Sequence, residues 1–449
     1  MLDSSNVSQL LKYALPLLIT VWTLKYLFSH EATYTVTDVT RKFKDQKELF
    51  ISDFLEHEID GNIDGTGIAE LCASKRWTPG LILTCDPAPG GIGMVKNAHL
   101  NCIRFAIEMG AELVVPKIVR RDDKNIVNII PTTGGGPPRG EPFDYMFDFG
   151  HLNQTLSRFC PQMKVYQSMD DLYDVPEVFT ARPITLGGMQ VMTVNSTVIE
   201  DMSLLPQQIK SYLDMSSPPE ARRYPIRFNL EVTNWAFPTA FDKPSVARNF
   251  GRLVRINGNA RRIAATGLYN LQKRFSLDLD PRTGIKNGKF VGVHLRTEAD
   301  VDGLFPDFET QAAYLLDYIA SSKARVVFMA TGAKEEHIAA FVMRAKTLNA
   351  TVVLKRDILS EKDREVYDKF TWDQRALVDY EVILRAGRMA GPSESSFAWN
   401  LALRRNCAFG ASEGGQDLSS NFTVQWQDAY SAIFGISEKG FVFKSTIWP

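Results

Sequence analysis

The last third of the chain alternates between short apolar segments and amphipathic segments, and this alternation limits the fold more than any other feature of the sequence. The apolar segments have the length of strands, and the segments between them have the apolar spacing of helices. This order predicts a doubly wound parallel sheet, which binds ligands at the carboxyl ends of its strands. The predicted strands span 289–295, 325–330, 351–354, 388–391 and 407–410, and the predicted helices span 309–321, 334–348, 374–386 and 395–405.

A second region of this kind lies nearer the start of the chain. The apolar segment 81–85 predicts a strand, and a glycine-rich turn follows it at 87–93. Residues 94–109 then have helical spacing, Gly110 ends the helix, and 112–118 predicts the next strand. A strand, a helix and a second strand in this order pair in parallel.

The two regions together predict an α/β protein with two facing Rossmann-like domains built on parallel sheets. At about 100–200 residues per domain, 449 residues have room for both. The region between them is less regular, with predicted helices at 151–160 and 200–214 and a predicted strand at 225–232. We expect 1–30 to be a cytosolic tail and anchor, 31–77 a stem, 78–240 the first domain, 241–285 a basic helical link and 286–449 the second domain.

The segment 10–28 is strongly apolar, and its only charges are Lys12 and Lys25, one near each end. It is a single-pass signal anchor, a cleaved signal peptide, or a buried or interfacial helix. Its uncharged part, 13–24, is short for a span of about 20 residues. No small-residue cleavage signature follows Phe28, which favours the anchor.

Glycosylation sequons and cysteines bear on the compartment. With an anchor, the sequons favour a lumenal body attached to the endoplasmic reticulum or Golgi membrane. In that oxidising lumen the five cysteines allow two disulfides and one free thiol, and the alternative is five reduced, buried thiols. The sequons begin at Asn153, Asn195, Asn349 and Asn421.

The charge balance argues against a nucleic-acid partner, because 51 basic residues face 52 acidic ones. One stretch departs from this balance, since 244–277 holds seven basic residues and no acidic one. That stretch is either a solvated helix surface or a basic wall beside an anionic ligand. No CxxC pair is present, which argues against a structural zinc site.

Three segments at predicted strand ends could carry chemistry. The first is Gly90-Gly-Ile-Gly93, where glycines let backbone amides approach a phosphate at a helix start. The second is His294-Leu-Arg-Thr-Glu298, in which alternation places His294, Arg296 and Glu298 on one side. The third is Gly391 to Phe397, a turn whose serines either cap the following helix or bind phosphate. The DxD pairs at 278–280 and 300–302 are short enough to arise by chance.

Taken in order, these segments resemble the GDP-fucose protein O-fucosyltransferase family. The resemblance rests on three motifs: Pro89-Gly-Gly-Ile-Gly93, His294-Leu-Arg-Thr-Glu298, and Asp379 followed by Gly391 and Ser395-Ser-Phe397. It covers about residues 78–410. In the first motif Met94 stands where many members have asparagine, and Asn97 follows three residues later.

The resemblance implies a GT-B architecture, in which the two Rossmann-like domains face each other. It also implies inverting transfer of fucose from GDP-fucose to a hydroxyl of a protein or glycan, with no cofactor and no obligate metal. Arg296 would neutralise the departing diphosphate, and Glu298 is the candidate base. Residues 286–449 would form the nucleotide-sugar-binding domain. The residues implied in donor binding are Gly91, Gly93, Asn97, His294, Asp379, Ser395, Ser396 and Phe397.

Two other functions compete with this one. A non-catalytic nucleotide-sugar-binding or lectin-like protein of the same fold would fit the substitution at Met94. A Rossmann oxidoreductase fits less well, because the GxGxxG fingerprint is missing.

Overall fold

The computed structural model describes residues 45–88, 90–129, 140–180, 184–185, 207, 210–211, 214, 218–220, 222–230, 237–282, 290–410, 416–417, 423–435 and 443–449. It divides into two compact units, 1–52 and 53–449. The predicted anchor at 10–28 lies outside the described residues. Within the described ranges, no helix is both long enough and apolar enough to cross a membrane.

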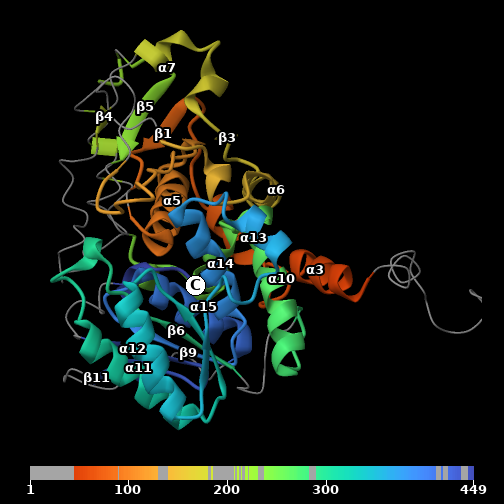
Figure 1. Ribbon diagram of the computed structural model, residues 1–449. Helices are drawn as coiled ribbons and strands as arrows, with labels where there is room; N and C mark the ends of the chain where they lie inside the picture. The colour runs from red at the N-terminus through yellow and green to blue at the C-terminus, as the bar shows by residue number, and fades with distance from the viewer. Residues whose placement is uncertain are drawn as a thin grey trace, which may run out of the picture. The chain divides into compact units, whose positions relative to one another are not determined.

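The second unit contains two sheets (Figure 1). The first is all parallel, with strand order β3-β2-β1-β5-β4. The second has the order β10-β11-β12-β9-β6-β7-β8, in which β10 and β11 are antiparallel additions at one edge. This confirms the predicted α/β fold with parallel sheets.

The strands of the first sheet are β1 (Leu81–Cys85), β2 (Glu112–Val114), β3 (Val165–Tyr166), β4 (Ile184–Thr185) and β5 (Ile226–Leu230). Those of the second are β6 (Phe290–His294), β7 (Val326–Ala330), β8 (Thr351–Val353), β9 (Arg388–Pro392), β10 (Gln416–Asp417), β11 (Thr423–Gln427) and β12 (Ser431–Gly435). The α-helices are α3 (Gln46–Glu56), α4 (Thr66–Ala73), α5 (Ile92–Met109), α6 (Phe149–Phe159), α7 (Pro176–Thr180), α9 (Pro244–Phe250), α10 (Gly258–Phe275), α11 (Phe308–Ser322), α12 (Glu335–Thr347), α13 (Glu361–Tyr367), α14 (Trp372–Leu384) and α15 (Ser396–Phe409). The 3₁₀-helices are η1 (Phe143–Tyr145), η2 (Met169–Leu172), η5 (Thr239–Phe241), η6 (Gly251–Leu253) and η7 (Ala299–Val301).

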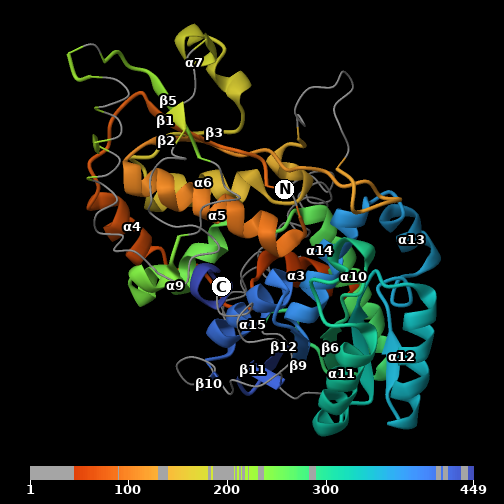
Figure 2. The same ribbon diagram turned by 90° about the vertical axis from the view of Figure 1, so that its left-hand side faces the viewer.

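The second sheet has the strand order of a Rossmann half, because β8-β7-β6-β9-β12 runs 3-2-1-4-5 along the chain. Every residue of β6 and β7 is buried, as expected for parallel strands covered on both faces. Helices α11 and α12 pack side by side, and α14 and α15 form another contacting pair (Figure 2). The strand order reverses between β6 and β9, so the carboxyl ends of these two strands mark the expected ligand site.

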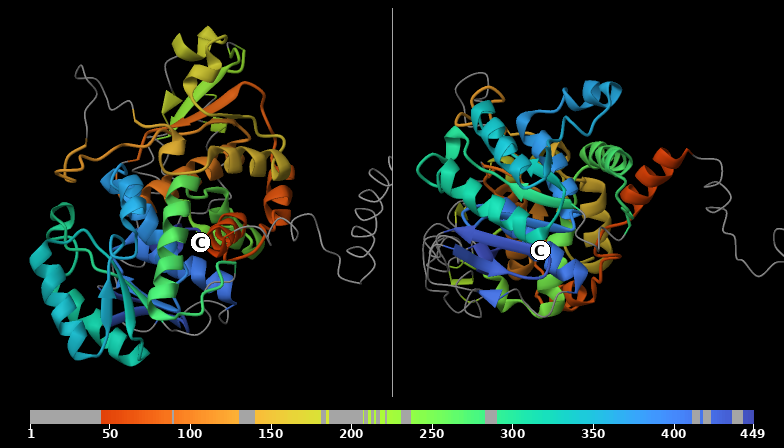
Figure 3. Two further views of the ribbon diagram at one scale, coloured as in Figure 1. Left: turned by 45° about the vertical axis from the view of Figure 1, so that its right-hand side comes forward. Right: turned by 60° about the horizontal axis from the view of Figure 1, so that its bottom comes forward.

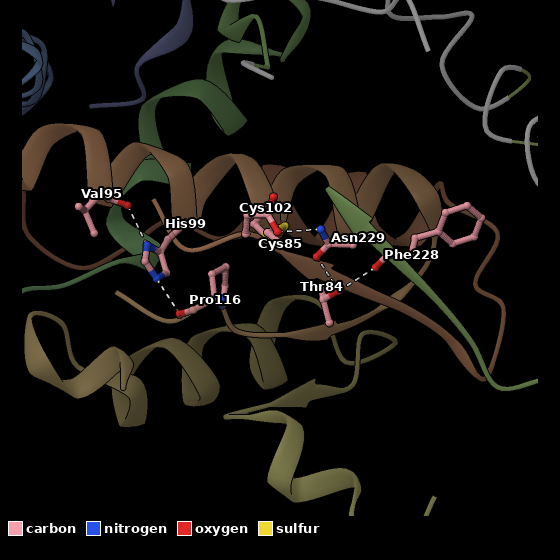
Figure 4. Close-up of a disulfide and its surroundings, with 9 residues drawn as sticks. Thr84, Cys85, Val95, His99, Cys102, Pro116, Phe228 and Asn229 are labelled. Atoms are coloured by element: carbon pink, nitrogen blue, oxygen red, sulfur yellow. Dashed lines mark hydrogen bonds between the residues drawn. A yellow bond between two sulfur atoms is a disulfide. The ribbon is translucent and has the colours of Figure 1, made fainter. Parts of the chain in front are cut away.

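In the first sheet β1 lies between β2 and β5, and α5 packs on β1 and β2. A disulfide joins Cys85 at the end of β1 to Cys102 on α5. Figure 4 shows this bridge with the buried His99, whose ring contacts the carbonyl oxygens of Val95 and Pro116 at 2.8 and 3.0 Å. The disulfide joins α5 to the end of β1, and the contact of His99 with Pro116 holds α5 against the segment after β2.

Most predicted elements of the alternating regions are confirmed, with ends shifted by a few residues, but the predicted strand 407–410 is wrong. Those residues form the last turn of α15, and the strand that pairs in parallel with β9 is β12. The predicted helix at 200–214 lies largely outside the described residues.

Residues 53–77, which we expected to belong to a stem, are part of the second unit. Helix α4 lies in this segment, and a disulfide joins its Cys72 to Cys160 at the end of α6. Together with the bridge of α5, this pairs four of the five cysteines and leaves Cys407 as the free thiol.

The basic stretch 244–277 does not form a wall beside the cavity described below. The long helix α10, drawn green in Figure 3, packs against α14 and carries much of this stretch. Arg252, Arg255 and Arg261 pair with Asp60, Asp148 and Glu58, respectively. The other four basic side chains, Arg248, Arg262, Lys273 and Arg274, are exposed.

Candidate active site

A cavity of about 370 Å³ opens at the carboxyl ends of β6 and β9 and extends to the glycine loop after β1. Three segments distant in the sequence meet there: the glycine loop, the turn after β6 and the turn after β9. The predicted residues that line it are Gly91, Gly93, His294, Arg296, Glu298, Asp379, Ser395, Ser396 and Phe397.

The first turns of α5 and α15 meet at this cavity. A Cβ atom on Gly93 would lie 2.5 Å from the backbone nitrogen of Phe397 and 2.5 Å from the carbonyl carbon of Ser396, so only glycine allows this approach. Helix α5 begins after Gly91 without a side-chain cap, and the Ser395 hydroxyl accepts a bond from the Ala398 N–H at 3.3 Å to cap α15. Two helix N-termini therefore direct partial positive charge at the cavity.

The formal charges of the cavity lining are balanced. Because neither sign is in excess, the partial positive charges of the two helix N-termini make the electrostatic potential in the cavity favour an anion. The basic side chains of the lining are Arg121, Arg296, Lys355 and Arg375, and the acidic ones are Glu298, Asp300, Asp379 and Glu394.

Arg296 occupies the turn after β6, and two carboxylates hold its guanidinium. It pairs with Glu298 at 2.6 Å and with Asp300 at 2.5 Å. Its backbone N–H donates to Gln311 Oε1 at 3.0 Å, which fixes the turn against α11. Burial works to lower the pKa of Arg296, but Glu298 and Asp300 outweigh it and raise that pKa, so the side chain stays charged.

Both oxygens of Glu298 are engaged. Oε1 accepts a bond from the Gly332 N–H at 2.5 Å, and Oε2 is the atom paired with Arg296. A general base needs a free oxygen to receive a proton, so this arrangement favours a role for Glu298 in holding Arg296.

His294 ends β6, and its ring lies against that of Phe397, with centroids 4.6 Å apart. Burial, together with the charges of Arg296 and Lys355, lowers the pKa of His294 to about 3. The imidazole is therefore neutral at ordinary pH and adds no charge to the cavity.

Asp379 on α14 pairs with Lys355, which lies just after β8. Burial raises the pKa of Asp379 to about 6, even though Lys355 opposes this shift. Its Oδ1 atom is buried and has no hydrogen-bond partner among the residues that the structure describes. This oxygen can accept a bond from an N–H group of a ligand in the cavity.

Some lining residues were missed from the sequence. Lys355 follows the predicted strand 351–354, so its place at a strand end was a usable signal. Trp372 and Arg375 lie on the first turn of α14, and Arg121 lies in an irregular segment after β2. No local pattern marks Arg121, because its partners are more than 170 residues away.

The other residues that the sequence analysis named differ in their position. Met94 lines the cavity and is 43% exposed, whereas Asn97 is not part of the lining. Asn153 and Asn349 are exposed, while Asn195 and Asn421 lie outside the described residues.

Among the residues that the structure describes, the DxD aspartates belong to no cluster that could hold a metal ion. Asp280 pairs with Arg282, and Asp300 with two arginines. In the described part of the chain, Asp53, Glu56 and His57 are close enough to share an ion, but they lie outside the cavity lining.

The sequence profile of the GDP-fucose protein O-fucosyltransferase family matches residues 82–408, a range that contains the motifs of the cavity. The chain belongs to this family. No curated protein matches it.

Several solved structures resemble this family member at low identity. POFUT1 in complex with GDP is 15% identical, with a TM-score of 0.46, and the match covers 80% of this chain and 100% of that one. NodZ fucosyltransferase from Bradyrhizobium is 14% identical, with a TM-score of 0.37 and coverage of 73% and 92%. A mutant of Arabidopsis thaliana FUT1 in complex with GDP is 9% identical, with a TM-score of 0.38 and coverage of 80% and 77%.

Proposed function

We propose that this protein transfers fucose from GDP-fucose to a hydroxyl group of a protein or glycan, with inversion at the anomeric carbon and without a metal ion. One observation carries the proposal: the motifs of the matched family, spread over some 300 residues, converge on one cavity with two helix N-termini. A sugar nucleotide needs such a site, because its diphosphate is anionic and its base and sugar are polar.

In this reaction the acceptor oxygen forms a bond to the anomeric carbon of fucose. The bond from that carbon to the β-phosphate oxygen breaks, and its electron pair leaves with GDP. The hydroxyl proton passes to a base or to water. Negative charge grows on the departing diphosphate, so a fixed cation and fixed N–H donors lower the barrier.

Arg296 would supply the cation, and the first turns of α5 and α15 would supply N–H donors. Asp379 would accept from the nucleobase through Oδ1, and Phe397 with His294 would form an uncharged wall of the pocket. Losing one such transition-state donor typically costs about 10²–10³ in turnover.

We also propose that the protein works in the lumen of the endoplasmic reticulum or Golgi, attached to the membrane through residues 10–28. The two disulfides support this, because disulfides persist in oxidising compartments. The exposed sequon residues Asn153 and Asn349 are accessible for glycosylation there.

Calorimetry and a donor-consumption assay on the purified full-length chain test the activity. We expect the chain to bind GDP and GDP-fucose, to release GDP from the donor, and to keep this activity in EDTA. A protein that bound neither nucleotide would refute the proposal, and strong dependence on a divalent ion would refute its metal-free form.

Arg296→Ala should abolish transfer. Because that variant leaves Glu298 without its arginine and Asp300 with Arg121 alone, Arg296→Lys serves as a milder change that keeps the charge but loses the fork of two N–H groups. We expect Arg296→Lys to fold and to lose at least tenfold in turnover. Arg282→Ala is the control and should match wild type, because Arg282 is exposed, pairs with Asp280 and is not part of the cavity lining.

The alternative is a non-catalytic nucleotide-sugar-binding protein, and Met94 favours it, because a thioether lines the cavity where the family motif has an amide. Nucleotide binding without turnover across a screen of protein and glycan acceptors would select this alternative.

A further inference from the structure

Arg121 lies outside the motifs but inside the cavity. It follows β2 in the half of the unit that carries the glycine loop, and its side chain is only 6% exposed. A Cβ atom on Gly91 would lie 3.7 Å from Nη2 of Arg121, so the guanidinium sits beside the glycine loop. The same group lies 4.5 Å from the ring centroid of Trp372.

The guanidinium of Arg121 bridges two carboxylates from the other half of the unit. Nε and Nη2 donate to Asp373 Oδ1 at 2.9 and 2.6 Å, and Nη1 donates to Asp300 Oδ2 at 2.9 Å. The backbone N–H of Arg121 donates to Asp373 Oδ2 at 3.3 Å. Each guanidinium nitrogen therefore donates to a carboxylate, which uses three of the five guanidinium N–H groups and fixes the plane of the fork between Asp373 and Asp300.

One oxygen connects Arg121 to Arg296. Asp300 Oδ2 accepts from Arg121 and also from Arg296 Nη2, and the ring centroid of Trp372 lies 5.7 Å from the Arg296 guanidinium. Without Arg121, the charge of Asp300 would act on Arg296 alone, and Asp373 would be buried without its cation. Arg296 would then be drawn toward the carboxylates and away from an incoming anion.

We propose that Arg121 is a positioning residue: by holding Asp300, it keeps the Arg296 fork in place and leaves part of the Arg296 charge for the donor diphosphate. This inference rests on the proposed function, in which Arg296 binds that diphosphate. Lysine cannot replace Arg121, because one ammonium group lacks the fork that spans Asp373 and Asp300.

A double-mutant cycle on the full-length chain tests the inference, with Arg121→Lys, Arg296→Lys and the double variant. We expect Arg121→Lys to lower turnover and GDP affinity by roughly 10- to 100-fold each. Because Arg121 acts through Arg296, the double variant should be no worse than Arg296→Lys alone within about threefold. Arg120→Lys is the matched control, since the neighbouring Arg120 is half-buried, pairs with Asp123 and Glu141, and is not part of the cavity lining.

Calorimetry separates positioning from a loss of folded protein. Partial unfolding of a variant would lower the number of GDP sites per chain and leave the dissociation constant of the remaining sites unchanged. A loss of positioning would instead raise that dissociation constant and keep one GDP site per chain. Asp373→Asn, which weakens the same anchor while Arg121 stays charged, should shift the constant in the same direction.

Three results would overturn the inference. Losses that multiply in the double variant would mean that Arg121 acts on the donor independently of Arg296. An Arg121→Lys variant with wild-type affinity and turnover would mean that the contact is dispensable. A wild-type chain that bound no GDP would refute the proposed function, and this inference with it, whereas binding with either of the first two results would refute the inference alone.

Discussion

Gly93→Ala tests the contact between the first turns of α5 and α15. The new Cβ would lie 2.5 Å from two backbone atoms of α15 and 2.7 Å from the carbonyl oxygen of Ser396. Ordinary contact begins at 3.4 Å, so the helix starts must separate by about 1 Å. The obstacle is backbone, which cannot rotate aside as a side chain can.

The magnitude of the effect follows from this displacement. Overpacking a core contact costs about 1–3 kcal/mol, and a displacement of about 1 Å in a site can cost about 10² in rate. The separation moves the N–H groups of α5 away from Ser396 and Phe397. The N–H groups of the two helix starts can then no longer contact the donor at the same time. We expect Gly93→Ala to lower donor turnover by about 100-fold and to lower the unfolding temperature.

Donor-release kinetics, GDP calorimetry and thermal unfolding measure the effect. Gly258→Ala is the control, because Gly258 is the first residue of α10 and a Cβ there meets nothing within 4 Å. It should keep wild-type activity and be as stable or slightly more stable. A Gly93→Ala variant with the GDP affinity, turnover and unfolding temperature of wild type would show that the contact between α5 and α15 does not shape the site.

Two further predictions follow from buried titratable groups. Burial, together with the charge of Arg404, lowers the pKa of Lys96 from 10.5 to about 7. Between pH 7 and pH 10.5 the unfolded chain therefore binds more protons than the folded chain. The free energy of unfolding should rise with pH across this window. Lys96→Met should therefore raise the free energy of unfolding at pH 7, by at most about 5 kcal/mol. In denaturant titrations from pH 7 to pH 10, this free energy should rise less steeply with pH in Lys96→Met than in wild type. The same rise with pH in both proteins would contradict this prediction. The carboxylate of Asp379, whose pKa burial raises to about 6, is the form that accepts from a nucleobase, so GDP affinity should fall as pH drops from 7 to 5, by about tenfold per unit at most. In calorimetry Asp379→Asn should bind GDP more weakly and lose this pH dependence, and an affinity that rose toward pH 5 would contradict the role.

Much of the site was predictable because parallel sheets impose a rule on the sequence. The turns after the predicted strands 289–295 and 388–391 held candidate ligand groups, and the structure brings both turns to the same cavity. Lys355 obeys the same rule after β8. The predicted strand 407–410 failed for the opposite reason: a short apolar run has the same pattern in a strand and in the last turn of a buried helix.

The basic stretch 244–277 shows the limit of reading charge from the sequence. Its seven basic residues suggested an anionic ligand as one alternative, yet three of them pair with carboxylates far away in the chain. The charge of a segment says little about a site until the segment's partners are known, because ion pairs form between positions that only folding brings together.

The local order of apolar and polar residues was enough to establish the α/β class, the two parallel sheets, the family motifs and the strand ends at which they lie. These features depend on neighbours in the chain, so a one-dimensional pattern records them. The Arg121 bridge, the approach of Gly93 to α15, the engagement of Glu298 and the pairing of the cysteines required the folded chain. Each of these depends on distances between residues that the sequence separates, and tertiary packing alone sets those distances.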